Sequence, residues 1–71
     1  MSKNYKVINY WKDYDDENYY MLLLNYNVIN VYVGENKNGI GFSDELYGYC
    51  FISCTGEVTL GISFDDMLSL L

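Results

Sequence analysis

The chain contains no alanine, proline, arginine, glutamine or histidine, and its only basic residues are four lysines. Without histidine, it lacks the residue that most often serves as general base, proton shuttle or zinc ligand. Without arginine, it lacks the planar side chain that binds phosphates and carboxylates through two parallel hydrogen bonds. We therefore expect a protein that is not an enzyme and that has no catalytic residues, no metal site and no cofactor.

Two segments resemble ligand-binding loops but lack essential positions of each motif. Residues 34–41 have two glycines at the spacing of a phosphate-binding P-loop, yet isoleucine and glycine replace the lysine and the hydroxyl residue that should follow. Residues 13–24 begin with the alternating acids of a calcium-binding loop, yet they lack its central glycine and its final bidentate glutamate. Neither segment is expected to bind the ligand of its motif.

Acidic residues outnumber basic ones by ten to four, which gives a net charge of −6 at pH 7. This balance argues against direct nucleic-acid binding, because phosphate recognition depends on clustered cations. The longest apolar run, residues 19–24, is far shorter than the roughly 20 residues of a membrane-spanning helix. The N-terminus also lacks the apolar stretch of a signal peptide. We expect a protein of the bacterial host cytoplasm that contacts neither nucleic acid nor membrane.

With 71 residues, the chain is expected to form one small domain that spans residues 1–71. Residues 5–11 alternate loosely between polar and apolar, and residues 28–33 form a largely β-branched run that ends at Gly34. Both patterns predict strands, although Tyr5, Ile8 and Trp11 also fit helical spacing. Together with a hairpin further along the chain, they predict an α+β fold that is mostly β. We expect a small curled antiparallel sheet of four or five strands with a short C-terminal helix.

Glycines mark the expected turns between the later strands. Residues 34–41 predict a loop whose Asn-Gly pair forms a tight turn, because both residues tolerate positive φ angles. Residues 47–54 and 58–64 predict the two strands of a β-hairpin with its turn at Gly56.

Residues 16–26 fit both a helix and a strand. Helical spacing would place four apolar residues on one face of a helix capped by Asp15 or Asp16, namely Tyr19, Leu22, Leu23 and Tyr26. Alternate residues are also apolar, as on a strand, namely Tyr20, Leu22, Leu24, Tyr26 and Val28. We favour the strand, because aromatic and β-branched character continues to Val33.

Residues 63–71 predict a short amphipathic helix. Ser63 has the position of an N-cap, with Asp66 as its capping-box partner. The apolar stripe of this helix consists of Phe64, Met67, Leu68 and Leu71. We expect the stripe to pack against the domain's own sheet. The alternative is that Met67, Leu68 and Leu71 contact a second copy, which would give a homodimer, an oligomerising accessory module or a small-ligand site between protomers.

Cys50 and Cys54 are the two thiols of the chain. On one strand they would point to the same face with Cα atoms roughly 13 Å apart, from about 3.3 Å per residue. A disulfide needs Cα atoms closer than about 7 Å, so we expect no bond between them. Both are expected to be buried, as small apolar residues in a reducing compartment.

Two features are typical of an interface with another protein that has a basic surface. Each has an alternative explanation: the acidic charge also serves solubility, and a biased codon pool also supplies tyrosines to half-buried strand positions. Carboxylates cluster at residues 13–17, and complementary charge steers association between proteins. Nine tyrosines are too many for so small a core, and tyrosine is enriched in protein interfaces. The candidate partner-binding residues are Asp13, Tyr14, Asp15, Asp16, Glu17, Tyr19, Asp44 and Glu45. The other tyrosines considered for the surface are Tyr10, Tyr26, Tyr32, Tyr47 and Tyr49.

The excess of asparagine and tyrosine over alanine, proline and arginine indicates a gene from an A/T-rich genome, such as that of a low-GC bacterium, a phage or a plasmid. In size and composition, the chain resembles the small inhibitors that phages and mobile elements encode, of which the anti-CRISPR proteins are the best known. The resemblance implies binding to a CRISPR effector nuclease where it would hold DNA or guide RNA, as an acidic DNA mimic does. The resulting hypothesis is a non-catalytic inhibitor that occupies a basic surface of a bacterial nucleic-acid-handling protein.

Overall fold

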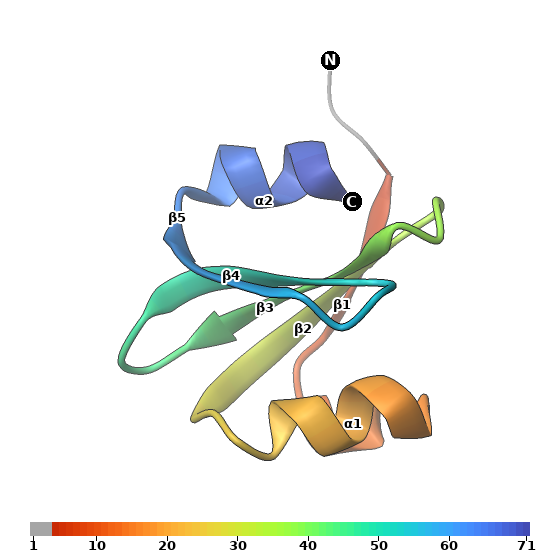
Figure 1. Ribbon diagram of the computed structural model, residues 1–71, viewed down its shortest axis with the longest axis vertical. Helices are drawn as coiled ribbons and strands as arrows, with labels where there is room; N and C mark the ends of the chain where they lie inside the picture. The colour runs from red at the N-terminus through yellow and green to blue at the C-terminus, as the bar shows by residue number, and fades with distance from the viewer. Residues whose placement is uncertain (1–3) are drawn as a thin grey trace.

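The computed structural model describes residues 4–71, which form a five-stranded antiparallel sheet with a helix on each face (Figure 1). The strands lie in the sheet in the order of the sequence: β1 (Tyr5–Ile8), β2 (Val28–Gly34), β3 (Gly39–Asp44), β4 (Gly48–Ser53) and β5 (Val58–Ile62). A 3₁₀ helix, η1 (Trp11–Asp13), and helix α1 (Glu17–Leu23) connect β1 to β2, and α2 (Phe64–Leu70) follows β5. The expected α+β, mostly β fold with a C-terminal helix is confirmed.

The sheet buries apolar side chains on both faces, because neighbouring residues of a strand point in opposite directions. On the face covered by α1, the core consists of Leu23, Val31, Ile40, Phe42, Cys50 and Ile52. On the face covered by α2, it consists of Tyr32, Phe51, Met67 and Leu71. Tyr32, one of the tyrosines considered for the surface, is therefore a core residue with only 7% of its surface exposed.

The strand favoured for residues 16–26 is wrong, because most of this segment forms α1. The side chain of Asp16 accepts hydrogen bonds from the backbone N–H groups of Asn18 (3.1 Å) and Tyr19 (3.4 Å), and these bonds cap the first turn. Leu23 is fully buried against the sheet. The cap and the apolar face outweigh the strand propensity of the aromatic residues, and residues 16–26 contain no β-branched residue.

The loop expected across residues 34–41 is shorter than predicted, since β3 already begins at Gly39. Ile40 and Phe42 point into the core under α1, and Gly41 between them faces α2. A Cβ atom on Gly41 would lie 2.5 Å from the sulfur of Met67, so only glycine lets α2 approach the sheet this closely. The glycine that looked like part of a loop is therefore a packing position within a strand.

The hairpin of β4 and β5 is confirmed, and its turn contains Gly56 at a φ of 89°. Strand β5 also contains a β-bulge. Phe51 pairs with Thr59, but Tyr49 pairs with Ile62, so β5 has one more residue than β4 in this interval. Gly61 adopts a φ of 68° there, which favours glycine. The bulge leaves Ile62 packed on the core under α2, although Val58 packs on the opposite core.

Helix α2 lies across the sheet as the preferred interpretation of its apolar stripe predicts (Figure 1). The hydroxyl oxygen of Ser63 accepts a hydrogen bond from the backbone N–H of Asp66 at 3.0 Å, as an N-cap does. Met67 and Leu71 are fully buried against the chain's own sheet, so these two side chains do not lie on a surface that a second copy could contact. No helix among residues 4–71 has the length and apolar character needed to cross a lipid bilayer.

Candidate functional site

The acidic segment, defined as residues 13–17, connects η1 to α1. Asp13 is the last residue of η1, Asp16 is the N-cap of α1 and Glu17 is its first residue. The four carboxylate side chains of the segment are all exposed. The structure therefore presents four of the chain's ten acids on one short stretch of surface, although helix ends occupy much of the turn expected there.

Asp44 does not belong to this surface, which corrects its place among the candidate partner-binding residues. Its side chain is only 3% exposed and accepts three backbone hydrogen bonds. The donors are the N–H groups of Asn27 (2.7 Å), Leu46 (2.7 Å) and Tyr47 (2.8 Å). Asp44 therefore organises the turn between β3 and β4 and ties it to the start of β2.

Glu45 is exposed, but it lies at the other end of α1 from the acidic segment. Its backbone N–H donates to the carbonyl oxygen of Asn27, which follows the C-terminus of α1, whereas the acidic segment precedes its N-terminus. A helix of seven residues is about 10 Å long, at 1.5 Å per residue. The structure thus separates Glu45 from the candidates at residues 13–19.

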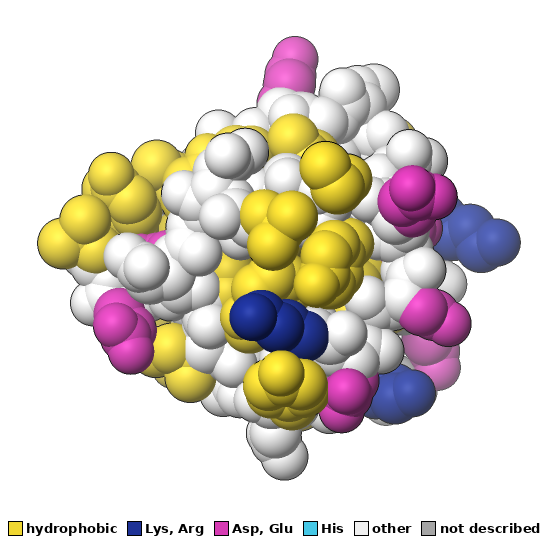
Figure 2. Space-filling model, turned by 90° about the horizontal axis from the view of Figure 1, so that it is seen from below, with side chains coloured by type: hydrophobic (Ala, Val, Ile, Leu, Met, Phe, Trp, Pro, Cys, Tyr) yellow, Lys and Arg dark blue, Asp and Glu magenta, His cyan; other side chains and the backbone are white. Residues whose placement is uncertain are grey.

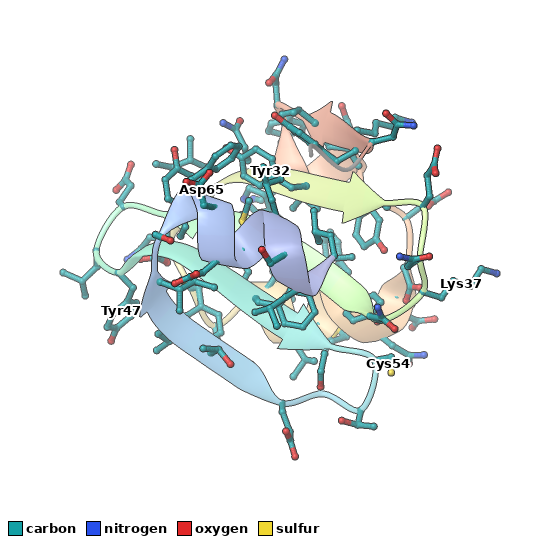
Figure 3. All side chains as sticks on the ribbon, turned by 90° about the horizontal axis from the view of Figure 1, so that it is seen from above. Tyr32, Lys37, Tyr47, Cys54 and Asp65 are labelled. Atoms are coloured by element: carbon teal, nitrogen blue, oxygen red, sulfur yellow. The ribbon has the colours of Figure 1, made fainter. Side chains whose placement is uncertain are left out.

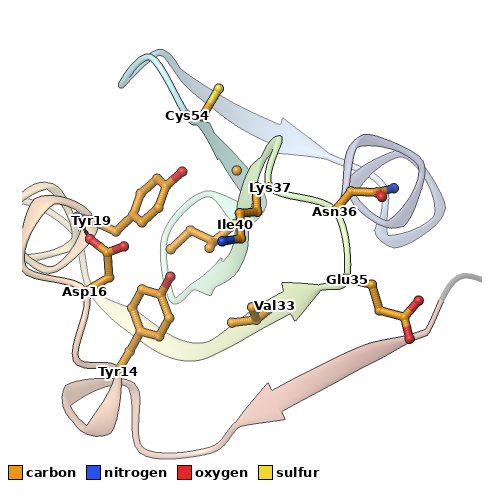
Figure 4. Close-up of a pocket in the computed structure, with 11 residues that line it drawn as sticks. Tyr14, Asp16, Tyr19, Val33, Glu35, Asn36, Lys37, Ile40 and Cys54 are labelled. Atoms are coloured by element: carbon orange, nitrogen blue, oxygen red, sulfur yellow. Dashed lines mark hydrogen bonds between the residues drawn. The ribbon is translucent and has the colours of Figure 1, made fainter.

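Tyr14 and Tyr19 come together at the acidic segment and form one side of a pocket of about 430 Å³ (Figure 4). The centroids of their rings are 6.2 Å apart, and the ring planes are inclined by 42°. Both side chains are half-buried. Val33 and Ile40 from the sheet lie beneath the two rings. We call this site the tyrosine pocket; its polar lining residues include Asp16, Glu35, Lys37 and Cys54.

Burial raises the pKa of both tyrosine hydroxyls. It raises the pKa of Tyr14 to about 12, and the nearby charges of Asp16, Tyr19 and Asp15 add to this effect. Burial also raises the pKa of Tyr19, with smaller contributions from Cys54 and Asp16. Because negative charges disfavour a further anion, the same carboxylates that raise these pKa values favour a cation at the pocket.

Asp16 has a structural role and a place in the pocket at once. One carboxylate oxygen, Oδ1, accepts the two capping hydrogen bonds of α1. The side chain lies at the edge of the pocket beside Tyr19 (Figure 4). Within residues 4–71, no hydrogen bond reaches the second oxygen, Oδ2, so this oxygen can accept one from a ligand.

The two cysteines have different surroundings, which corrects the expectation that both are buried. Cys50 is buried in the core under α1, and burial raises the pKa of its thiol. Cys54 is exposed because β4 ends at Ser53, which leaves Cys54 in the following turn at the rim of the tyrosine pocket. Both thiols are free, in agreement with the expectation that they do not pair.

Sequence reasoning identified Tyr14, Asp16 and Tyr19 but missed the other residues that line the pocket. Lys37 comes from the turn between β2 and β3, and Cys54 from the turn between β4 and β5. These turns meet the start of α1 only because the sheet brings them to one end. No local pattern in the sequence signals this meeting.

Hydrophobic side chains also gather on the face that carries α1, with acidic side chains around its margin (Figure 2). The ring centroids of Trp11 and Tyr20 are 5.3 Å apart, and Nζ of Lys12 lies 5.7 Å from the centroid of the Trp11 ring. Met21 and Leu24 are exposed beside them. The chain's own side chains thus engage the Trp11 ring, while Met21 and Leu24 remain exposed.

The chain matches no known protein family, no curated protein and no solved structure in the comparisons made with each. No group of three or more cysteine and acidic side chains in residues 4–71 is arranged to hold a metal ion. The tyrosine pocket offers a ligand two aromatic faces with their hydroxyls, a carboxylate oxygen and apolar contacts from Val33 and Ile40.

Proposed function

We propose that this chain is a non-catalytic inhibitor that binds a basic surface of a bacterial nucleic-acid-handling protein. A CRISPR effector nuclease is the first partner to test, because the chain resembles anti-CRISPR proteins in size and composition. The observation that carries the proposal is the position of the tyrosine pocket directly beside the acidic segment.

This arrangement matches the anatomy of protein interfaces. Binding energy in such interfaces is concentrated in a few buried aromatic or arginine side chains, and a more polar rim surrounds them. Here Tyr14 and Tyr19 offer half-buried rings, and Asp13, Asp15 and Glu17 supply exposed charges next to them. The rings would provide contact area, and the carboxylates would steer a basic partner toward them.

A charge-neutralised variant tests the role of the acidic segment. The triple variant D13N/D15N/E17Q removes three negative charges and leaves the Asp16 cap of α1 intact. The matched control is E45Q/D65N/D66N, which removes three exposed negative charges elsewhere on the chain. Because the net charge changes equally, a difference between the two variants reports the position of the charges.

The experiment measures association of each variant with a guide-loaded CRISPR effector nuclease, together with inhibition of its DNA cleavage. We expect the acidic-segment variant to associate more slowly, with a flatter dependence on salt, and the control to resemble the wild type. Equal association rates for the two variants at low salt would remove the acidic segment from the interface. If the wild type captures no nucleic-acid-handling protein from a bacterial lysate and does not inhibit this nuclease, the proposed function is wrong.

A further inference from the structure

The tyrosine pocket has the size to hold one long side chain of a partner. Its volume of about 430 Å³ falls within the range of roughly 300–1,000 Å³ that is usual for small-ligand sites. Tyr14 and Tyr19 wall the pocket on one side, and Val33 and Ile40 form its apolar floor. A flexible aliphatic stem with a polar end group fits such a lining, because the stem covers the floor and the end group stays near the rim.

The charges around the pocket favour a cationic end group. Asp16 has an oxygen that no hydrogen bond from residues 4–71 occupies, and Asp15 stands beside it in the chain. The carboxylate of Glu35 accepts a hydrogen bond from Asn4 at 3.3 Å and points away from the two rings (Figure 4). The one cation among the lining residues, Lys37, extends outward from the body of the protein (Figure 3).

We propose that the tyrosine pocket receives an arginine side chain from the partner's basic surface. The guanidinium group stacks on the rings of Tyr14 and Tyr19 and donates hydrogen bonds to Oδ2 of Asp16. Arginine suits this site better than lysine because its guanidinium is planar, weakly hydrated and able to stack on aromatic rings. This inference rests on the proposed function, since it names the partner group that the pocket recognises.

Blocked amino acids test the pocket without the partner. The probes are N-acetyl-arginine amide, the lysine equivalent and the citrulline equivalent, which keeps the shape of arginine but has no charge. Binding is followed by NMR chemical shifts of the nitrogen-labelled protein. We expect arginine to shift the signals of pocket residues and to bind about two- to tenfold more tightly than citrulline. Equal binding of the two, or shifts spread over the whole surface, would overturn the inference.

Substitutions locate the binding site and show whether it prefers a cation or an anion. Tyr14→Leu should weaken arginine binding about two- to fivefold, whereas Tyr14→Phe should retain most of it because the ring remains. The matched control is Tyr10→Leu, an exposed tyrosine outside the pocket, which should have no effect. Lys37→Met removes the rim cation and should strengthen binding about twofold. If Lys37→Met instead abolishes binding of inorganic phosphate, the pocket is an anion site and the inference is wrong.

The two proposals fail in distinguishable ways. If the chain inhibits the nuclease and loses affinity in the acidic-segment variant, but Tyr14→Leu binds the nuclease as the wild type does, the proposed function stands and the arginine inference falls. If the pocket binds the arginine probe but the chain has no nucleic-acid-handling partner, the proposed function falls and the pocket's preference for arginine stands.

Discussion

The carboxylate of Asp44 accepts a hydrogen bond from the backbone N–H of Asn27 at 2.7 Å, across 17 residues of sequence. A second bond runs beside it, from the N–H of Glu45 to the carbonyl oxygen of Asn27, at 3.0 Å. Together these bonds join the turn between β3 and β4 to the segment that leaves α1. They hold that connection against the sheet at the end opposite the tyrosine pocket.

Replacing Asp44 with alanine should destabilise the protein by about 3 kcal/mol. The substitution removes three part-buried hydrogen bonds to a carboxylate, each of which contributes about 1.5–3 kcal/mol, and water replaces part of this because Asn27, Leu46 and Tyr47 are exposed. The matched control is Glu45→Ala at the exposed neighbouring position, which should change stability by less than about 0.5 kcal/mol. Urea unfolding of the two variants measures the difference. Equal midpoints would show that the hydrogen bonds of Asp44 contribute nothing to stability.

Replacing Gly41 with alanine should cost about 1–3 kcal/mol, because the new Cβ would overlap the side chain of Met67. A double-mutant cycle with Met67→Val identifies the cause. If the clash is responsible, the shorter side chain relieves it, and the double variant is more stable than the sum of the single effects by about 1 kcal/mol. Strictly additive effects in urea unfolding would instead show that the two residues do not interact.

Much of the sheet was predictable because its signals are local. A β-branched run marks β2, a glycine marks the turn between β4 and β5, and a serine followed by an apolar stripe marks α2. Helix α1 was not predictable in this way, because its apolar residues fit both the helical and the strand period. Two facts decide in favour of the helix. The Asp16 cap was a sequence signal of the helical alternative, whereas the burial of Leu23 depends on strands that are distant in the sequence.

The candidate site was predictable only where it is continuous in sequence. Tyr14, Asp16 and Tyr19 lie within six residues of one another and share the pocket. Asp44 was misassigned because an aspartate in a turn is usually solvated, and its distant partner Asn27 gives no local signal. Cys54 was misassigned because β4 ends one residue earlier than the apolar run suggested.

Stability should fall as the pH rises from about 10 to about 12, and Tyr14 should be one cause. Its folded-state pKa of about 12 exceeds the ordinary value of 10, so in this window the unfolded chain releases the proton and the folded chain keeps it. Deprotonation therefore favours the unfolded state, whereas below about pH 10 both states are protonated and the group has no effect. Tyr19, whose pKa is also raised, acts in the same direction.

Tyr14→Phe provides the control for this pH dependence. Phenylalanine keeps the ring in the pocket but has no proton to release, so the loss of stability between about pH 10 and about pH 12 should be shallower than in the wild type. Urea unfolding across this range measures the slope, and ultraviolet absorbance of tyrosinate follows the titration. Identical slopes for the two proteins would mean that Tyr14 has the same pKa in the folded and unfolded states.

The two cysteines should react with a thiol reagent at very different rates. Cys54 is exposed at the rim of the tyrosine pocket and should react quickly in the folded protein, whereas Cys50 has no exposed surface and should react only when the protein unfolds. Counting modified thiols by mass spectrometry should give one in the native protein and two in denaturant. Cys54→Ser should abolish the fast reaction and leave the slow one, which assigns each rate to its residue. Because Cys54 lines the pocket, addition of the blocked arginine probe should slow the fast reaction, whereas the citrulline probe at the same concentration should slow it less. Rapid modification of Cys50 in the native state would contradict its burial under α1.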